Sequence, residues 1–298
     1  MKNNILKILL LLFVLLTLIG CSEDIIITVP PSGMRTIDYE PAWSPDGHTI
    51  AYLHTDDTSA ARIGIYLIDT NGTNKRLLAG NFARSPDFSP DGNWITFHNG
   101  QIYKIKINGD SLTQLTSGGS NYFPSWSPDG QWIAYDSDFN DPTGSIVIWK
   151  VKPDTSIRRD ISQHGVGEWR QPSWSPDGKR IVHQRYVGVG EPEIVIMDSS
   201  GQNPVRITFN NNWDMYPRFS PDGQKIIFTQ KHETSVNCQI YTIKIDGTDL
   251  TMLTNTQGFT AGYSPDGEKI VYCDSSPGNG RLWIMNKDGS NKRQLTFP

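Results

Sequence analysis

The stretch Trp43-Ser44-Pro45-Asp46-Gly47 decides the fold, because its core, SPDG, occurs six times in the chain. The six serines are Ser44, Ser89, Ser127, Ser175, Ser220 and Ser264, at intervals of 45, 38, 48, 45 and 44 residues. A period of about 40 to 45 residues is typical of the four-stranded blades of a β-propeller. Proline presets φ in a tight turn, aspartate bonds nearby backbone, and glycine accepts a positive φ. We therefore interpret SPDG as a repeated turn and not as a catalytic serine and aspartate.

The repeat extends on both sides of this turn. The residue before each serine is aromatic: Trp43, Phe88, Trp126, Trp174, Phe219 and Tyr263. Isoleucine stands six residues after each serine and a large ring residue eight after it, and a spacing of two indicates a strand. A second apolar segment, a Gly-containing turn in five of the six copies, and a short last strand follow. The pattern predicts an all-β fold over residues 41–298, a six-bladed β-propeller of four-stranded antiparallel blades.

The N-terminal residues have the pattern of an export signal. A basic start and an apolar run over residues 8–19 lead into Leu18-Ile19-Gly20-Cys21, which resembles a bacterial lipobox. We predict a lipoprotein signal peptide over residues 1–20, and the resemblance implies that Cys21 is acylated and anchors the chain to a membrane. Residues 21–40 would then form a lipidated tether. Ser22 and Glu23 do not resemble an inner-membrane retention signal, so we expect an exported outer-membrane lipoprotein that faces the periplasm or the cell surface.

Charge and cysteine content narrow the possible partners. The formal net charge is −4, and removal of the two lysines of the signal peptide leaves −6. Nucleic-acid binding needs a basic stripe, so this acidic, unclustered chain is not expected to bind nucleic acid. Besides Cys21 the chain has Cys238 and Cys273, which we expect to be two isolated, buried thiols. No motif points to a bound cofactor.

The order of the sub-motifs resembles the repeat of TolB-type propellers. Each copy has an aromatic residue before SPDG, then a segment such as IAY (residues 50–52), a segment such as IYLI (65–68), and a last strand such as QLT (294–296). The resemblance covers residues 41–298. It implies a six-bladed propeller that binds the peptidoglycan-associated lipoprotein and other envelope partners. The chain departs from the family in having no room for a preceding α/β domain and in its expected anchor at Cys21.

Partner binding is expected on one face of the ring. The first and third connections of each blade are short turns, so the long, varied loops would all lie on the opposite face. Aromatic and arginine side chains dominate many protein interfaces. The candidates for partner binding at the mouth of the central channel are Tyr122, Trp169, Arg170, Trp213, Asp214 and Tyr216. The alternative is that some of these rings cap the core between blades.

Two charged residues are expected inside the channel. Asp87 and Arg218 each stand two residues before the serine of their blade and lie three blades apart, hence across the ring. They could hold ordered water or a ligand, or they could be solvated. The leading hypothesis for the whole chain is a non-enzymatic, lipid-anchored envelope module that binds a protein or glycan.

The alternative hypothesis is a metal-assisted polysaccharide lyase. Oligogalacturonate lyases are similar propellers with imidazole-rich centres, and His54, His98, His183 and His232 are all expected on the loop side. His183 occupies a position that is Tyr or Phe in the other blades, which favours a hydrogen-bonded core residue. No spacing matches a zinc signal, so we predict no metal ligand and no catalytic residue. Ring closure is open, and we expect the C-terminal strand, and not residues 25–28, to complete the sixth blade.

Overall fold

The computed structural model describes residues 36–56, 59–140, 144–162, 167–186, 190–235, 237–274 and 280–297. All of them belong to one compact unit, Met34–Pro298. The predicted signal peptide, Cys21 and residues 21–35 of the tether lie outside the described residues. No helix in the described part of the chain is long and apolar enough to cross a membrane.

Twenty-four strands form six four-stranded antiparallel sheets, which confirms the predicted fold. The first strands of the blades are β1 (Thr36–Trp43), β5 (Arg84–Phe88), β9 (Asn121–Trp126), β13 (Trp169–Trp174), β17 (Trp213–Phe219) and β21 (Gly258–Tyr263). The second strands are β2 (Thr49–Asp56), β6 (Trp94–His98), β10 (Ile133–Ser137), β14 (Arg180–Arg185), β18 (Lys225–Lys231) and β22 (Lys269–Asp274). The third strands are β3 (Gly64–Asp69), β7 (Ile102–Lys106), β11 (Val147–Val151), β15 (Glu193–Asp198), β19 (Cys238–Lys244) and β23 (Arg281–Asn286). The fourth strands are β4 (Arg76–Ala79), β8 (Thr113–Gln114), β12 (Arg158–Asp160), β16 (Val205–Arg206), β20 (Thr251–Met252) and β24 (Arg293–Gln294).

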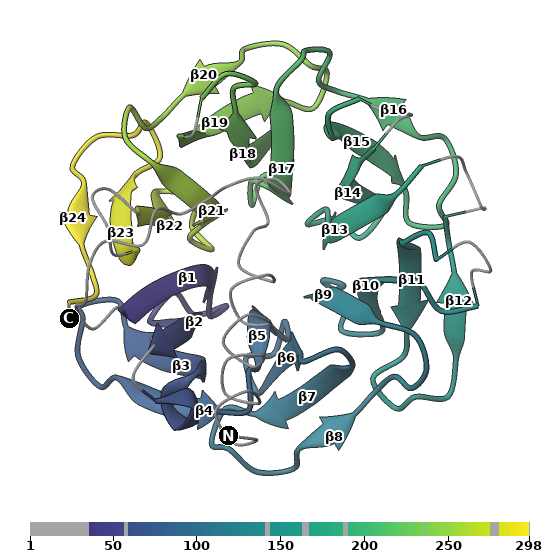
Figure 1. Cartoon of the computed structure of the whole chain (residues 1–298), viewed down its shortest axis with the longest axis vertical. Helices are drawn as coiled ribbons and strands as arrows, with labels where there is room; N and C mark the ends of the chain where they lie inside the picture. Colours follow the sequence, from purple (N-terminus) through teal and green to yellow (C-terminus); the bar gives the residue numbers. More distant parts are fainter. Residues whose placement is uncertain are drawn as a thin grey trace, which may run out of the picture. The chain divides into compact units, whose positions relative to one another are not determined.

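The blades surround a common centre, and each is made of four consecutive strands. The first strand of every blade lies nearest the centre and the fourth lies farthest out (Figure 1). Each first strand packs against the first strands of both neighbouring blades, and β1 contacts both β5 and β21. The ring of six blades is therefore closed within this unit.

The first and last blades meet without exchanging a strand. β24 pairs with β23, so the C-terminal strand completes the sixth blade as expected. The propeller was predicted to begin at residue 41, whereas β1 begins at Thr36. Residues 36–40 therefore belong to the first blade and not to the tether. This half-strand is held across the seam, because the Asp38 N–H donates to the Gly280 carbonyl at 3.1 Å and Arg281 Nη2 donates to Thr36 Oγ1 at 2.9 Å.

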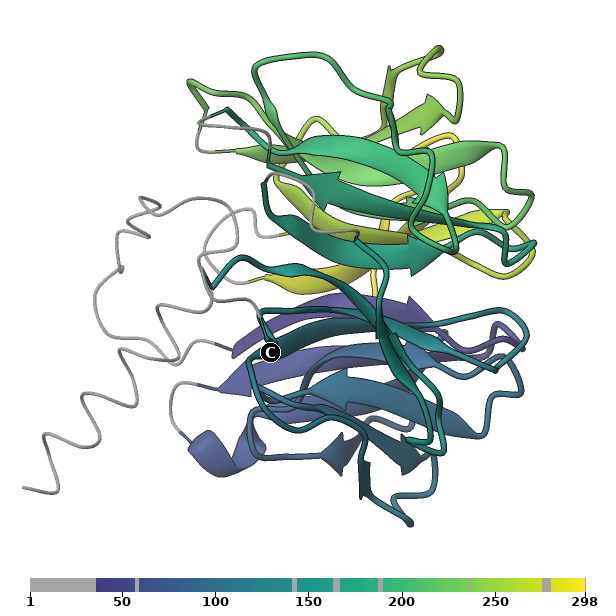
Figure 2. The same ribbon diagram turned by 90° about the vertical axis from the view of Figure 1, so that its right-hand side faces the viewer.

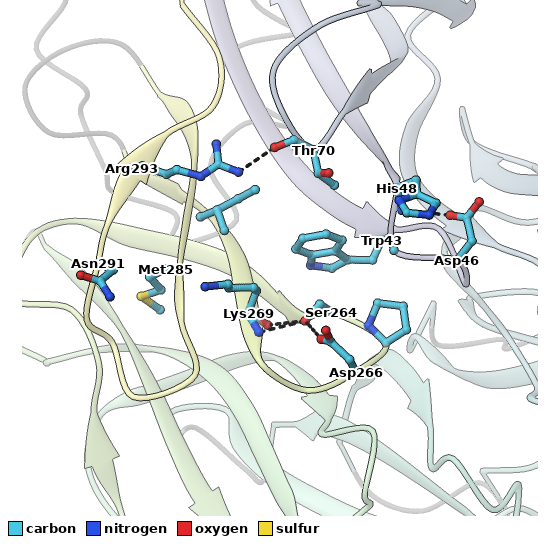
Figure 3. Close-up of a pocket in the computed structure, with 13 residues that line it drawn as sticks. Trp43, Asp46, His48, Thr70, Ser264, Asp266, Lys269, Met285, Asn291 and Arg293 are labelled. Carbon is cyan, nitrogen blue, oxygen red and sulfur yellow. Dashed lines mark hydrogen bonds between the residues drawn. The ribbon is translucent and has the colours of Figure 1, made fainter.

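Side chains also fasten the seam at its other end. The Trp43 indole N–H donates to the Gly262 carbonyl at 3.2 Å, and Arg293 Nη2 donates to the Thr70 carbonyl at 2.7 Å. Figure 3 shows the Trp43 ring between the turn of the first blade and that of the sixth, in a hollow of about 530 Å³. The seam is therefore closed by side-chain contacts to backbone carbonyls at this end.

The SPDG segments are turns, as predicted, and their serines are structural. The Ser175 hydroxyl donates to Asp177 Oδ1 at 2.6 Å and accepts the Arg180 N–H at 2.9 Å, while Gly178 has φ +68°. All six copies repeat these two hydrogen bonds. A Cβ on Gly178 would lie 3.3 Å from the Pro128 ring of the preceding blade. The same pairing of glycine and proline recurs at every blade junction, so the turns also set the spacing between blades.

The hydrophobic core consists of layers between neighbouring sheets. The layer at the seam packs Ile50 and Tyr52 of the first blade against Val271 and Leu282 of the sixth. The other layers are likewise built from aliphatic and aromatic side chains. Cys238 and Cys273 are both buried, as expected.

Candidate binding site

The two faces of the ring differ in their connections. Within each blade the strands are antiparallel, so the SPDG turns and the turns between third and fourth strands share one face, which we call the turn face. The connections between second and third strands and between blades share the opposite face, the loop face. Figure 2 shows the blades from the side, with strands running from one face to the other.

Each innermost strand has a β-bulge facing the channel. The bulged residue stands four before the SPDG serine and has a positive φ between 46° and 57° in all six blades. The register of pairing between first and second strands shifts at this point. The bulge ring consists of Glu40, Ser85, Phe123, Gln171, Tyr216 and Thr260. Because the conformation recurs in every blade, it is part of the architecture and not local strain at one site.

The bulges leave backbone N–H groups without a partner in the neighbouring strand. Side-chain oxygens of the preceding blade accept hydrogen bonds from these N–H groups. Glu40 Oε2 accepts the Ser85 N–H at 2.8 Å, and Gln171 Oε1 accepts the Tyr216 N–H at 2.8 Å. Thr260 Oγ1 accepts the Glu40 N–H at 3.2 Å across the seam. These inter-blade hydrogen bonds satisfy buried donors and fix the radius of the channel.

The bulge ring and the residues just after it line a central cavity of about 70 Å³. Asp87 and Arg218 are both among the residues that line it. Burial raises the pKa of Asp87 to about 6, while the charge of Arg218 and the hydrogen bond from the Trp126 N–H at 2.7 Å oppose that rise. The cavity has room for about two water molecules, so at this depth it fits ordered water or one small polar group.

A second ring lies one residue closer to the loop face. We call it the rim; it consists of Tyr39, Arg84, Tyr122, Arg170, Met215 and Phe259. All but Met215 are half-buried. Arg84 Nη2 donates to the Tyr39 hydroxyl at 3.1 Å, which joins the first two blades. The rim and the bulge ring below it combine aromatic and cationic side chains from all six blades.

Three predicted binding residues lie in these two rings of the innermost strands. Tyr122 and Arg170 belong to the rim, and Tyr216 belongs to the bulge ring. The Tyr216 ring lies 6.1 Å from the Phe123 ring, although the two come from the fifth and third blades. Trp213 is half-buried farther out, with its ring 6.3 Å from that of Tyr186.

Two predicted binding residues are not at the surface. Trp169 is 2% exposed and stacks on the His183 ring at 4.7 Å, and Asp214 is fully buried with its Oδ1 accepting from Gln230 at 2.8 Å. Both stand six residues before their serine, a position that is buried in all six blades. The equivalents are small in two blades, Ala83 and Gly258, which was the available signal that this position faces the core. We therefore remove Trp169 and Asp214 from the candidate surface.

Sequence reasoning missed four of the six rim residues. Tyr39, Arg84, Met215 and Phe259 were not predicted, because the bulge changes which residues face the channel. Counting residues back from each serine would have aligned them with Tyr122 and Arg170.

One serine and one histidine in the bulge region are close enough to interact. Ser85 Oγ lies 3.2 Å from His98 Nε2 and 3.1 Å from Glu40 Oε2. In a nucleophilic triad the carboxylate orients the histidine, whereas Glu40 contacts the serine. Burial lowers the pKa of His98 well below its usual range, so this imidazole is neutral at pH 7. The group is best explained as a buried hydrogen-bond network.

The other three candidate histidines, all within the described structure, do not form a metal-ligand cluster. His183 is fully buried with Nδ1 3.0 Å from the Gln184 carbonyl oxygen, and burial lowers its pKa to about 4, which fits a core residue. His54 Nδ1 lies 2.6 Å from Asp38 Oδ1, and His232 is exposed. Within the described ranges, no three His, Cys, Asp or Glu side chains are grouped as metal ligands.

Comparisons with known proteins agree with this architecture. The family model described as the TolB beta propeller domain matches residues 31–168 and 143–298. The Tol-Pal system protein TolB of Anaeromyxobacter dehalogenans is 30% identical over 109 residues, which are 37% of this chain and 25% of that protein. The matched segment thus spans about a quarter of this relative.

Solved structures show the same fold at low identity. Putative TolB from Agrobacterium tumefaciens has a TM-score of 0.67 at 21% identity, covering 89% of this chain and 90% of that one. An oligogalacturonate lyase in complex with manganese has a TM-score of 0.59 at 14% identity, covering 88% of this chain and 78% of that one. Since the family model spans nearly the whole described unit, the chain belongs to the TolB beta-propeller family.

Proposed function

We propose that this chain is a lipid-anchored, non-enzymatic module of the bacterial cell envelope that binds a protein partner at the loop-face opening of its channel. The observation that supports this most is that Tyr122, Arg170 and Phe259 are half-buried at equivalent positions of three innermost strands, one residue from the bulge ring. Half-buried aromatic and arginine side chains around a shallow opening are typical of interface anchors. A partner of the peptidoglycan-associated lipoprotein type follows from the relative that is named for the Tol-Pal system.

The attachment and location belong to the same proposal. Acylation of Cys21, after removal of residues 1–20, would hold the propeller at the outer membrane, facing either the periplasm or the cell surface. Metabolic labelling with an alkyne fatty acid is expected to mark the parent protein and not the Cys21→Ser variant. Equal labelling of both would contradict the anchor.

The binding proposal is tested with unit Met34–Pro298 and the purified peptidoglycan-associated lipoprotein of the same bacterium. Calorimetry is expected to show binding that Tyr122→Ala or Phe259→Ala weakens by roughly 30-fold each, the loss of about 2 kcal/mol usual for an anchor. Leu250→Ala is the matched control, since Leu250 is 52% exposed near the outermost strand of the fifth blade. Equal losses in all three variants would contradict the assignment to the loop face.

The lyase alternative rests on the shared fold with the manganese-bound oligogalacturonate lyase. It predicts manganese bound by the purified unit and, with oligogalacturonate, an unsaturated product that absorbs in the ultraviolet. We expect neither. Both together would replace the binding module by the lyase.

A further inference from the structure

The turn face of the second and third blades has an unusual combination of cations and indole rings. Between the second and third blades, Lys104 Nζ lies 4.6 Å and Lys106 Nζ 5.5 Å from the centre of the Trp94 ring. Trp94 is half-buried and packs on the core layer that includes Trp126. The two ammonium groups therefore lie over the Trp94 ring at this junction.

The next junction repeats the arrangement. Lys150 Nζ lies 4.8 Å and Lys152 Nζ 5.7 Å from the centre of the Trp132 ring, and the Arg159 guanidinium lies 5.8 Å from it. Lys150 Nζ also donates to the Ser199 carbonyl of the fourth blade at 3.0 Å. The cationic patch, as we call it, consists of Lys104, Lys106, Lys150, Lys152 and Arg159.

Among the described residues, no carboxylate lies within ion-pair distance of the cationic patch, although the Asp154 carboxylate acts on Lys104 and Lys152 from farther away. None of its members forms an ion pair with a carboxylate in the described part of the chain. The turn carboxylates Asp91 and Asp129 accept hydrogen bonds from the hydroxyls of Ser89 and Ser127 at 2.5 Å. These bonds lower the pKa of both carboxyls, so both keep their negative charge inside their own turns.

Lysines on the opposite side of the ring behave differently. Lys225 Nζ lies 3.3 Å and Lys244 Nζ 3.8 Å from Asp249 Oδ2, and Lys287 Nζ lies 2.8 Å from Glu268 Oε1. The cationic patch therefore lacks the close carboxylate partners that the lysines of the opposite sector have, which leaves its ammonium groups able to contact an external anion.

Exposed apolar residues adjoin the cations. Ile107 is 37% exposed and Leu112 is 60% exposed, and both lie in the hairpin that joins β7 to β8 directly after Lys106. Four of the five cations are lysines, which act as point charges and lack the fork of arginine that recognises a single phosphate. A broad patch of lysines with indole and aliphatic groups suits a surface of many headgroups better than one bound ion.

We propose that the turn face of the second and third blades docks on an anionic lipid membrane. The patch would lie flat on the headgroups, with Ile107 and Leu112 entering the interface. This contact is separate from the anchor at Cys21 and from the loop-face opening, so it holds or fails independently of the proposed function.

Vesicle co-sedimentation of unit Met34–Pro298, which contains the closed ring and lacks Cys21, tests the proposal. The unit is expected to bind phosphatidylcholine vesicles that contain phosphatidylglycerol, to ignore pure phosphatidylcholine vesicles, and to dissociate as salt is added. The variant K104Q/K106Q/K150Q/K152Q is expected to lose about fivefold in partitioning per lysine, hence about 600-fold in total. The matched control K225Q/K244Q/K269Q/K287Q removes the same charge from the opposite sector and is expected to lose less than about fivefold.

Several outcomes would overturn the docking surface. Equal losses in both quadruple variants would show that only net charge matters, and no binding to anionic vesicles would refute a membrane partner outright. Capture of soluble polygalacturonate without vesicle binding would replace the membrane by an anionic glycan. Circular dichroism checks that each variant is folded, and Lys106→Glu, at an exposed position, is expected to reduce binding even if the quadruple variant unfolds.

Discussion

The structural role of the SPDG turns can be tested at Ser175, the most buried of the six serines. Ser175→Ala removes the hydroxyl that donates to Asp177 Oδ1 at 2.6 Å and accepts the Arg180 N–H at 2.9 Å. A hydrogen bond to a charged group contributes about 1.5–3 kcal/mol, and an orphaned buried donor costs about 1–3 kcal/mol. Since the Arg180 N–H gains partial access to water, we expect a net loss of about 2–4 kcal/mol in the free energy of unfolding.

The assay is urea unfolding of unit Met34–Pro298, followed by tryptophan fluorescence at pH 7. The matched control is Ser199→Ala in the same blade, whose hydroxyl makes no hydrogen bond in the described part of the structure and whose loss is expected within about 0.5 kcal/mol. A loss of less than about 0.5 kcal/mol for Ser175→Ala would refute the structural role of the motif.

The same variant has a pH signature. The hydrogen bond from Ser175 lowers the pKa of Asp177 below its ordinary value of 3.8. A lowered folded pKa gives stability that is present above the unfolded pKa and is lost as the pH falls through the folded pKa. The difference between the parent and Ser175→Ala should therefore be largest above about pH 4 and shrink below it, and a difference that grows on acidification would contradict the reasoning.

Two further predictions concern buried groups near the loop face. Burial raises the pKa of Asp136 to about 7, although the charge of Arg170 opposes this rise. Because the unfolded chain ionises this carboxyl at a lower pH than the folded protein does, the free energy of unfolding should fall by a few kcal/mol as the pH rises from about 4 to about 7. Asp136→Asn should abolish this decline in thermal unfolding scans, and parallel pH profiles for parent and variant would argue against it. Trp169→Ala should destabilise the unit by about 3–5 kcal/mol because the ring is buried against His183, whereas Trp213→Ala should cost less than about 1.5 kcal/mol. Equal losses in urea unfolding would contradict the burial of Trp169.

The architecture could be predicted from the sequence because one physical requirement repeats. Each blade has a tight turn directly preceded by an aromatic residue, so six copies of SPDG predict six sheets. The first half of β1, Thr36 to Glu40, was not predicted because it lies before the first SPDG motif and its sequence has no repeat signal of its own. Its contacts to Gly280 and Arg281 depend on ring closure, which no local pattern encodes.

The candidate site could be predicted only in part. Tyr122, Arg170 and Tyr216 were placed at the channel because they precede the motif on innermost strands. Trp169 and Asp214 were misplaced because the alternation of a strand is interrupted by the bulge, and the bulge gives no signal beyond the following proline. Residue type alone could not separate a core tryptophan from an interface tryptophan.

The most direct test of the central claim, that the loop face carries the partner site, is site-specific photo-crosslinking in intact cells. A photoreactive phenylalanine analogue would replace Phe259 of the rim or, as a control, Leu250 near the outermost strand of the fifth blade, and adducts would be resolved by immunoblotting. We expect a discrete protein adduct from position 259 and none from position 250. An adduct from position 250 alone would contradict the assignment of binding to the loop face.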